Sequence, residues 1–193
     1  MSSFDIDQLR RRLLPENVNL AGTDSRLPGA AVAVIIDLKQ QGGAILLIRR
    51  TEREDDRWSG QIAFPGGHII PTDENLLETA IRETKEEVGI LLHEHELIGA
   101  LPLVYARNRT VRVAPFVFQL KRTVEIQHNV EVADAFWMDL AEIANSVIKN
   151  VEVNVADGKR RTDSYVYRGN VIWGLTFRII NLLLGRNIDV QQT

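Results

Sequence analysis

A charged helix behind a glycine turn constrains this chain more than any other stretch. Apolar spacing predicts a helix over residues 75–88, with a turn at Pro65-Gly66-Gly67 before it and Gly89 at its end. Three carboxylates then fall within one arc of roughly 100°, because successive residues turn by about 100°. These residues are Glu83, Glu86 and Glu87. The expected core face lies beside this arc and consists of Leu77, Ile81 and Val88.

This arrangement is unfavourable for a helix on its own. Like charges three or four residues apart destabilise a helix by some tenths of a kcal/mol per pair. Glu86 and Glu87 also lie at the C-terminal end, where the helix dipole disfavours anions. A bound divalent cation reverses the sign of these terms, and hard oxygen ligands favour Mg²⁺ or Mn²⁺ over zinc. Arg82 lies four residues from both Glu78 and Glu86 and can orient Glu86. The alternative is a solvated charged face.

The same stretch resembles the Nudix box of the Nudix hydrolases, a long motif of the form G-x5-E-x7-R-E-x-x-E-E-x-G followed by an apolar residue. The resemblance is carried by Gly67, Glu74, Arg82-Glu83, Glu86-Glu87 and Gly89-Ile90. Six residues rather than five separate Gly67 from Glu74. The extra residue falls in a loop, where insertions are tolerated. It leaves open whether Asp73 or Glu74 fills the first acidic position.

The resemblance implies both a fold and a reaction. The fold is of the α/β class, a Nudix-like α/β/α sandwich around a mixed β-sheet. The reaction is attack of water on a diphosphate linkage, with Mg²⁺ or Mn²⁺ screening the phosphate charge and activating the water. The metal ligands that it implies are Glu83, Glu86, Glu87 and the carbonyl of Gly67. Glu74 and Arg82 would mainly hold the loop and the helix together.

A further carboxylate outside the box often completes such a site in the family, and we expect it at Glu131. This residue lies in a polar segment, six residues before Trp137. Glu125 is the second candidate, and an exposed loop acid without a catalytic role is the alternative. The expected catalytic residues are Glu83, Glu86, Glu87 and Glu131.

The substrate is suggested by a narrower resemblance, to the coenzyme A pyrophosphatases. Its residues are the sequence GQIAFPGG at 60–67, the lengthened loop before Glu74 and the sequence IWGLT at 172–176. The segment LLIRRT at 46–51 departs from that subfamily, which has Leu-Leu-Thr-x-Arg followed by Ser or Ala. The predicted substrate is therefore coenzyme A or a derivative. The alternatives are ADP-ribose, dinucleotides, damaged nucleoside triphosphates, or a catalytically silent module that binds a nucleotide.

Arginines near the box suit phosphate groups, because the guanidinium fork pairs with them. Arg50 is the preferred substrate-binding residue, since it ends a strand just before a loop, and Arg49 and Arg107 are further candidates. A solvated surface is the alternative for each. Trp173 and Phe177 are expected in the apolar stripe of a last helix rather than at a ligand.

The remaining elements predict one domain with a mixed sheet. Residues 1–28 are expected to form an amphipathic helix capped by Asp5, then a linker, and residues 29–193 the Nudix hydrolase domain. Strands are expected at 30–38, 44–48, 61–64, 97–103, 111–120 and 135–138, with Pro115 marking a bulge or a sheet edge. A short helix at 140–148, a hairpin around Asp157-Gly158 and a last helix at 171–184 follow.

Composition excludes several classes of protein. The 193 residues are 45% hydrophobic and carry a formal net charge of −3, which disfavours nucleic acid as the ligand. The chain has no cysteine, so disulfides and thiolate metal sites are excluded. It begins without an apolar signal segment and has no run of about 18 apolar residues. We therefore expect a cytoplasmic protein without a membrane span, and we leave a homodimer open.

Overall fold

Strand β1 (Gly29–Asp37) lies at the centre of the main sheet. It pairs in parallel with β7 (Arg112–Gln119) along its whole length, and on its other side it meets β2 (Ala44–Arg50) only at Ile36 and Asp37. The computed structural model describes residues 4–15, 29–40, 42–53, 58–106, 111–155 and 158–186. Since β1 is one strand of a parallel pair and of antiparallel pairs, the sheet is mixed, as predicted.

β1 and β2 splay apart beyond their short pairing, and two short strands occupy the space. β3 (Ile62–Ala63) pairs with β2, and β4 (Gly66–His68) pairs with β1. The outer side of β2 is covered by β8 (Val132–Asp139), and β7 pairs further with β5 (Leu97–Ala100) and β6 (Val104–Tyr105). The splay places the glycine turn against β1.

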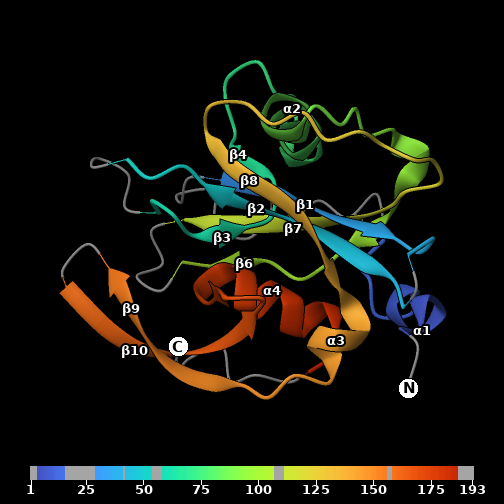
Figure 1. Ribbon diagram of the computed structural model, residues 1–193. Coiled ribbons are helices and arrows are strands. Elements are labelled where there is room, and N and C mark those ends of the chain that lie inside the picture. The colour runs from blue at the N-terminus through green and yellow to red at the C-terminus, as the bar shows by residue number, and fades with distance from the viewer. Residues whose placement is uncertain are drawn as a thin grey trace.

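Helices cover both faces of this sheet (Figure 1). The helix α2 (Leu76–Val88) lies on one face, and α4 (Gly174–Leu183) lies on the other. The side chains of successive β1 residues point to opposite faces of the sheet. Ile35 therefore packs in the core cluster beneath α2, and Ile36 packs in the core cluster that contains the apolar residues of α4. The result is the predicted α/β/α sandwich.

A second sheet lies beyond α4 (Figure 1). Its strands are β9 (Lys149–Val155), β10 (Gly158–Tyr167) and β11 (Asn170–Ile172). Tyr165 is fully buried and donates its hydroxyl to Oδ1 of Asn181 at 2.6 Å, which fixes β10 to α4. The smaller elements are α1 (Ile6–Arg10), a 3₁₀ turn η1 (Glu94–Glu96) and α3 (Leu140–Ala144).

The N-terminal helix α1 begins at the predicted cap, where Asp5 accepts hydrogen bonds from Asp7 N and Gln8 N. Its Leu9 is fully buried in the core cluster of α4, and Leu14 forms a β-bridge with Ala100. The described part of the arm is therefore packed on the domain. The predicted linker at 16–28 lies outside the described residues.

Two sequence predictions were wrong in detail, and a third was partly right. Pro115 lies inside the sheet rather than at an edge, but the pairing of β7 with β5 shifts register close to it, between Leu97 and Gly99. Its missing N–H faces the gap between β5 and β6, where Leu101 N donates to the Pro115 carbonyl. The last helix begins at Gly174 rather than at 171, since residues 170–172 pair with β10. Trp173 therefore precedes the helix and is only partly buried, with the Arg160 guanidinium 5.9 Å from its ring centroid.

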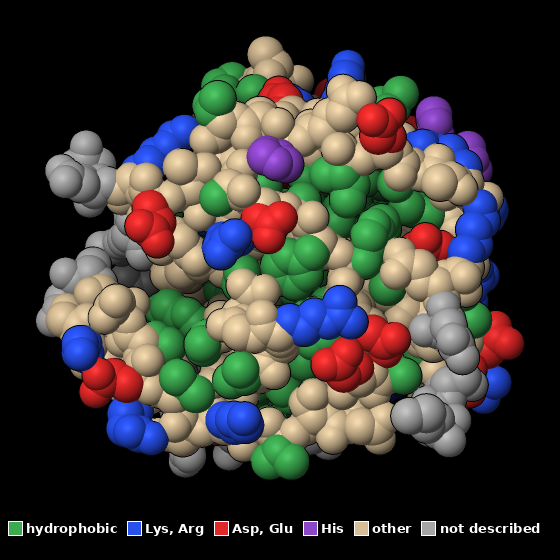
Figure 2. Space-filling model, viewed as in Figure 1, with side chains coloured by type: hydrophobic (Ala, Val, Ile, Leu, Met, Phe, Trp, Pro, Cys, Tyr) green, Lys and Arg blue, Asp and Glu red, His purple; other side chains and the backbone are tan. Residues whose placement is uncertain are grey.

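Strands β9 and β10 pair in antiparallel fashion from Val155 and Gly158 onward; Asp157 of the predicted turn lies outside the described residues. Among the helices of the described segments, none is both long and apolar enough to span a bilayer. In the space-filling view, acidic and basic side chains are interspersed over the visible face (Figure 2).

Candidate active site

The candidate site is built where the glycine turn meets α2. Gly66 pairs with Val32 and has a φ of 153°, and a Cβ there would lie 2.2 Å from the Ala31 carbonyl oxygen. A Cβ on Gly67 would lie 2.5 Å from Oε1 of Glu83. Gly66 therefore requires glycine, and the absence of a side chain at Gly67 leaves the space that the Glu83 carboxylate occupies.

Glu87 is the buried carboxylate of this site. Its residue is 2% exposed, and its Oε2 accepts a hydrogen bond of 2.9 Å from the amide of Gly66. The pKa of Glu87 is raised to about 7, mainly because burial disfavours its charged form; the charges of Glu83 and Glu131 add to this rise, whereas the Gly66 amide and Arg50 oppose it. A divalent cation beside Glu87 would favour its ionised form.

Arg82 connects the other two carboxylates of the arc. Its Nη1 donates to Oε1 of Glu83 at 2.8 Å and to Oε2 of Glu86 at 3.1 Å. The Glu83 side chain is mostly buried, whereas that of Glu86 is 55% exposed. The i, i+4 contact between Arg82 and Glu86 was predicted from spacing. No corresponding contact of Arg82 with Glu78 is described; the Glu78 carboxylate instead accepts from Glu74 N.

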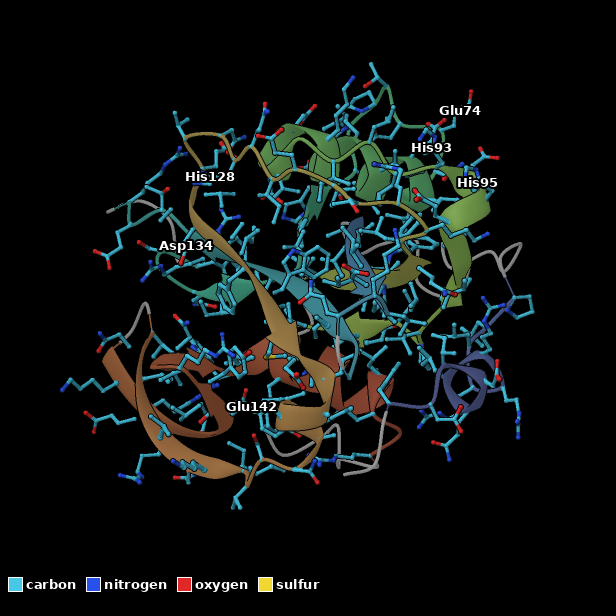
Figure 3. The ribbon with its side chains drawn as sticks, turned by 45° about the vertical axis from the view of Figure 1, so that its right-hand side comes forward. Glu74, His93, His95, His128, Asp134 and Glu142 are labelled. Atoms are coloured by element: carbon cyan, nitrogen blue, oxygen red, sulfur yellow. The ribbon has the colours of Figure 1, made fainter. Side chains whose placement is uncertain are left out.

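The first acidic position of the motif is filled by Asp73. Both of its carboxylate oxygens accept hydrogen bonds from Arg82, from Nε and from Nη2, each at 2.9 Å. These bonds hold the pKa of Asp73 low, at about 2, and raise that of the Arg82 guanidinium. The Glu74 side chain is exposed at the outside of the molecule (Figure 3). The structural role predicted for Glu74 therefore belongs to Asp73, because the extra loop residue shifts the register by one.

The two neighbouring arginines of β2 point to opposite faces. Arg50 lies half-buried with its Nη1 3.9 Å from Oε1 of Glu87, on the face of α2. Arg49 pairs with Asp134 of β8 at 3.4 Å. Alternation along a strand accounts for this difference. The site therefore includes Arg50 but not Arg49, and Arg107 lies outside the described residues.

Glu131 lies immediately before β8 and is exposed, as is Glu125. The Glu131 carboxylate forms an ion pair of 3.5 Å with Nη1 of Arg53. Its charge contributes to the raised pKa of Glu87. The neighbours of Glu125, Val124 and Ile126, pack against the core, which turns Glu125 outward.

The donor set fits a hard divalent cation in its chemistry. Glu83 and Glu87 are carboxylates at the junction of the glycine turn with α2, and the space at Gly67 accommodates Glu83. Within the described segments, however, no three acidic or histidine side chains converge on one point, since Arg82 lies between Glu83 and Glu86. A cation would therefore compete with Arg82 for these two carboxylates.

The sequence reasoning missed two contacts of this region. Arg53 was considered only as one of several arginines near the box that suit phosphates, and its pairing with Glu131 across the loop was not predictable from spacing. Thr176 donates its hydroxyl to the Ile62 carbonyl at 2.8 Å, which links α4 to the segment that enters the glycine turn. The sequence did contain a signal for this second contact. Ile62 and Thr176 lie in the two segments, 60–67 and 172–176, that carry the resemblance to the coenzyme A pyrophosphatases.

Comparisons with known proteins agree with this geometry. The family model of the NUDIX domain matches residues 27–157. The mouse mitochondrial coenzyme A diphosphatase NUDT8 is 30% identical over 191 residues, which cover 94% of this chain and 88% of the relative. The uncharacterized Nudix hydrolase NudL of Pectobacterium atrosepticum is 31% identical over 154 residues, covering 78% of this chain and 79% of the relative.

A solved structure supports the fold. The MutT/nudix family protein from Enterococcus faecalis superposes with a TM-score of 0.57 at 14% identity, covering 92% of this chain and 66% of that protein. Since the family model matches most of the chain and a relative of 30% identity spans nearly all of it, the chain belongs to the Nudix hydrolase family.

Proposed function

We propose that this Nudix hydrolase cleaves the diphosphate linkage of coenzyme A or a close derivative, with Mg²⁺ or Mn²⁺ as its metal. The observation that carries the substrate assignment is the hydrogen bond from Thr176 to the Ile62 carbonyl. It joins the two segments that resemble coenzyme A pyrophosphatases, 114 residues apart, beside the turn that leads into the box. The similarity to NUDT8 over 94% of the chain supports the same substrate class.

Nudix hydrolases generally use divalent metal ions, and in this chain Glu83, Glu86, Glu87 and the Gly67 carbonyl would hold them. The bound metal supplies charge neutralisation for the diphosphate and a lowered pKa for water. Gly66 orients Glu87 through its amide, and Arg82 orients Glu83 and Glu86 while Asp73 anchors it.

Glu131 is the proposed base. It accepts a proton from the water that attacks one phosphorus, and the bridging P–O bond then breaks. The products from coenzyme A are 3′-phosphoadenosine 5′-phosphate and 4′-phosphopantetheine. Arg50, on the same face as Glu87, is the proposed partner of a substrate phosphate, because its guanidinium reaches the site from the end of β2.

The test is kcat/KM for coenzyme A, dephospho-coenzyme A, ADP-ribose, a dinucleotide and a nucleoside triphosphate, each with Mg²⁺ and with Mn²⁺. We expect coenzyme A to rank first. If it ranks below another compound by tenfold or more, the substrate assignment is wrong and only the broader diphosphate hydrolase remains. If no compound is turned over with either metal, the chain is a silent binding module.

Arg50→Ala sharpens this test. Loss of a charge-assisted hydrogen bond costs about 1.5–3 kcal/mol, or roughly 10- to 150-fold in kcat/KM. We expect a larger loss with coenzyme A than with dephospho-coenzyme A, which lacks the 3′-phosphate. Equal losses with both would place Arg50 at the diphosphate itself.

The cytoplasmic location stays a prediction, and the mouse relative is named as mitochondrial.

A further inference from the structure

The backbone around Glu131 is fixed from two directions. The Thr51 amide donates to the Glu131 carbonyl at 2.9 Å, and the Thr51 hydroxyl donates to the Val130 carbonyl at 2.9 Å. The amide of Glu131 donates to Oδ1 of Asn129 at 2.8 Å. The loop that follows β2 therefore holds the segment that carries Glu131.

The same segment is attached to the end of α2. The Asn129 amide donates to the Glu87 carbonyl at 3.1 Å, and the Gln127 amide donates to the Val88 carbonyl at 3.0 Å. These bonds satisfy carbonyls that the helix end leaves without an intrahelical partner. Asn129, two positions before Glu131, thus contacts the backbone of Glu87 directly. The negative charge of Glu131 contributes to the raised pKa of Glu87.

The backbone contacts leave the Glu131 carboxylate free to rotate, and the ion pair with Arg53 restricts it. The two side chains are 48% and 47% exposed, and their charged atoms lie 3.5 Å apart. Arg53 is itself held, because its amide donates to the hydroxyl of Ser59 at 2.8 Å. An ion pair this exposed adds little to folding stability. Its effect is on the direction of the carboxylate.

We propose that Arg53 is a positioning residue, whose ion pair with Glu131 directs that carboxylate toward the water on the metal-facing side of α2. This inference rests on the proposed function, in which Glu131 is the base. It assigns Arg53 no contact with the substrate, in contrast to Arg50, which lies against Glu87.

A second ion pair provides a matched control. Arg49 and Asp134 lie 3.4 Å apart with side chains 47% and 50% exposed, nearly the same as for Arg53 and Glu131. This pair lies on the opposite face of β2. Asp134→Asn therefore removes an equivalent surface ion pair away from the site, and we expect it to leave kcat and KM unchanged.

The experiment is a double-mutant cycle on the full chain at saturating Mg²⁺, with the best substrate of the panel. Arg53→Ala should lower kcat by about tenfold with KM unchanged within about twofold, since backbone bonds still hold the segment and only the carboxylate is misdirected. Arg53→Lys should restore kcat to within about threefold. In a Glu131→Gln background, Arg53→Ala should have no further effect on kcat.

Three results would overturn the inference. A kcat of Arg53→Ala equal to that of Asp134→Asn would show that the ion pair between Arg53 and Glu131 has no effect on turnover. A rise in KM of the same factor in both backgrounds would show that Arg53 binds the substrate directly. Full activity of Glu131→Gln would remove the base on which Arg53 is proposed to act. Thermal midpoints without substrate, expected within about 4 °C of the unmodified chain, exclude misfolding as the cause.

Failure of the proposed function is seen separately. In that case the unmodified chain turns over none of the diphosphates, before any variant is compared.

Discussion

The two helices that cover the main sheet bring different chemistry to it. α2 presents charged groups at its inner edge, with Glu87 at 2% exposure and the Arg82–Asp73 pair mostly buried. α4 presents apolar side chains and neutral hydrogen-bonded groups, such as Thr176 and Asn181. Among its described residues α4 buries one charge, Arg178, which donates to the Tyr105 carbonyl.

This difference separates function from stability. On the side of α2, like charges lie together, so a cation relieves a repulsion that folding tolerates. On the side of α4, the buried polar groups described above are satisfied within the chain. Substitutions of the α2 carboxylates should therefore reduce activity while preserving stability, and substitutions on α4 should do the reverse.

The largest expected effect is loss of turnover on the side of α2. Glu86→Gln and Glu87→Gln should each reduce kcat by two or more orders of magnitude, roughly the contribution of a metal or an acid–base group. Without metal, thermal stability should hold or rise slightly, because a repulsion is removed. Glu142→Gln is the control for Glu86→Gln, since Glu142 lies on α3 and its side chain is 51% exposed, close to the 55% of Glu86 (Figure 3). Near-full activity of both box variants would contradict the assignment.

The second effect distinguishes Asp73 from Glu74. Asp73→Asn removes the charged partner of a mostly buried guanidinium, and breaking such a pair costs roughly 3 kcal/mol. Glu74→Gln should stay within about 0.5 kcal/mol, because its side chain is exposed. Urea unfolding measures both. A larger loss for Glu74→Gln would restore Glu74 to the structural position that the motif suggested.

The third effect is a pH dependence of the metal-free chain. The pKa of Glu87 is about 7 in the folded chain and near 4.5 for an ordinary glutamate in the unfolded chain, so the folded chain binds more protons between these limits. Stability should therefore fall as pH rises from about 4.5 to 7, by up to about 3 kcal/mol. Asp73 does not change the slope of stability over this pH range. Its pKa is about 2, so the stability that its ionised form provides is lost only in stronger acid.

Denaturation in EDTA across this pH range measures the effect. Glu87→Gln and added Mg²⁺ should each flatten the curve, the first by removing the titrating group and the second by stabilising its ionised form. A rise in stability with pH over the same range would contradict the assigned direction.

The smallest effect lies on the side of α4. Thr176→Val leaves the Ile62 carbonyl without its donor and should cost about 1–2 kcal/mol, whereas Thr176→Ser keeps the hydroxyl. Below the unfolding transition, kcat of Thr176→Val should match that of the unmodified chain. A large loss of kcat at unchanged stability would show that this side takes part in the chemistry and would end the separation drawn above.

The sequence predicted most accurately the features that depend on local spacing. The helix was expected at 75–88 and is found at Leu76–Val88, with Gly89 in the left-handed conformation at its end. The strands expected at 30–38 and 44–48 are found at Gly29–Asp37 and Ala44–Arg50. These features need no knowledge of distant residues.

The core-facing side of α2 was predicted in part. Val88 is fully buried as predicted, whereas Leu77 and Ile81 are only partly buried, and Leu76 and Ala80 lie buried in the core cluster. Leu76 and Leu77 are equally hydrophobic, so only the packing of the helix on the sheet decides which of them is buried.

The features that were missed depend on long-range pairing. β11 resembles the start of a helix in sequence, but β10 pairs with it. That Arg50 rather than Arg49 lies against Glu87, and that Arg49 pairs with Asp134, depends on how β2 packs against α2 and β8. The pairing of Asp73 with Arg82 needed the loop conformation, which an inserted residue changes. Each of these was settled by tertiary contact rather than by propensity.

The parallel pairing of β1 with β7 has a consequence for the order of folding. The pairing joins Gly29 to Arg112 and Ile36 to Gln119, so a long stretch of chain that includes α2 must close as a loop first. Such distant pairings slow folding, because the entropy of loop closure is lost before contacts compensate for it. During synthesis, the centre of the sheet cannot form until β7 has left the ribosome. The helix α2 is synthesised early, but its stable packing against β1 is completed late.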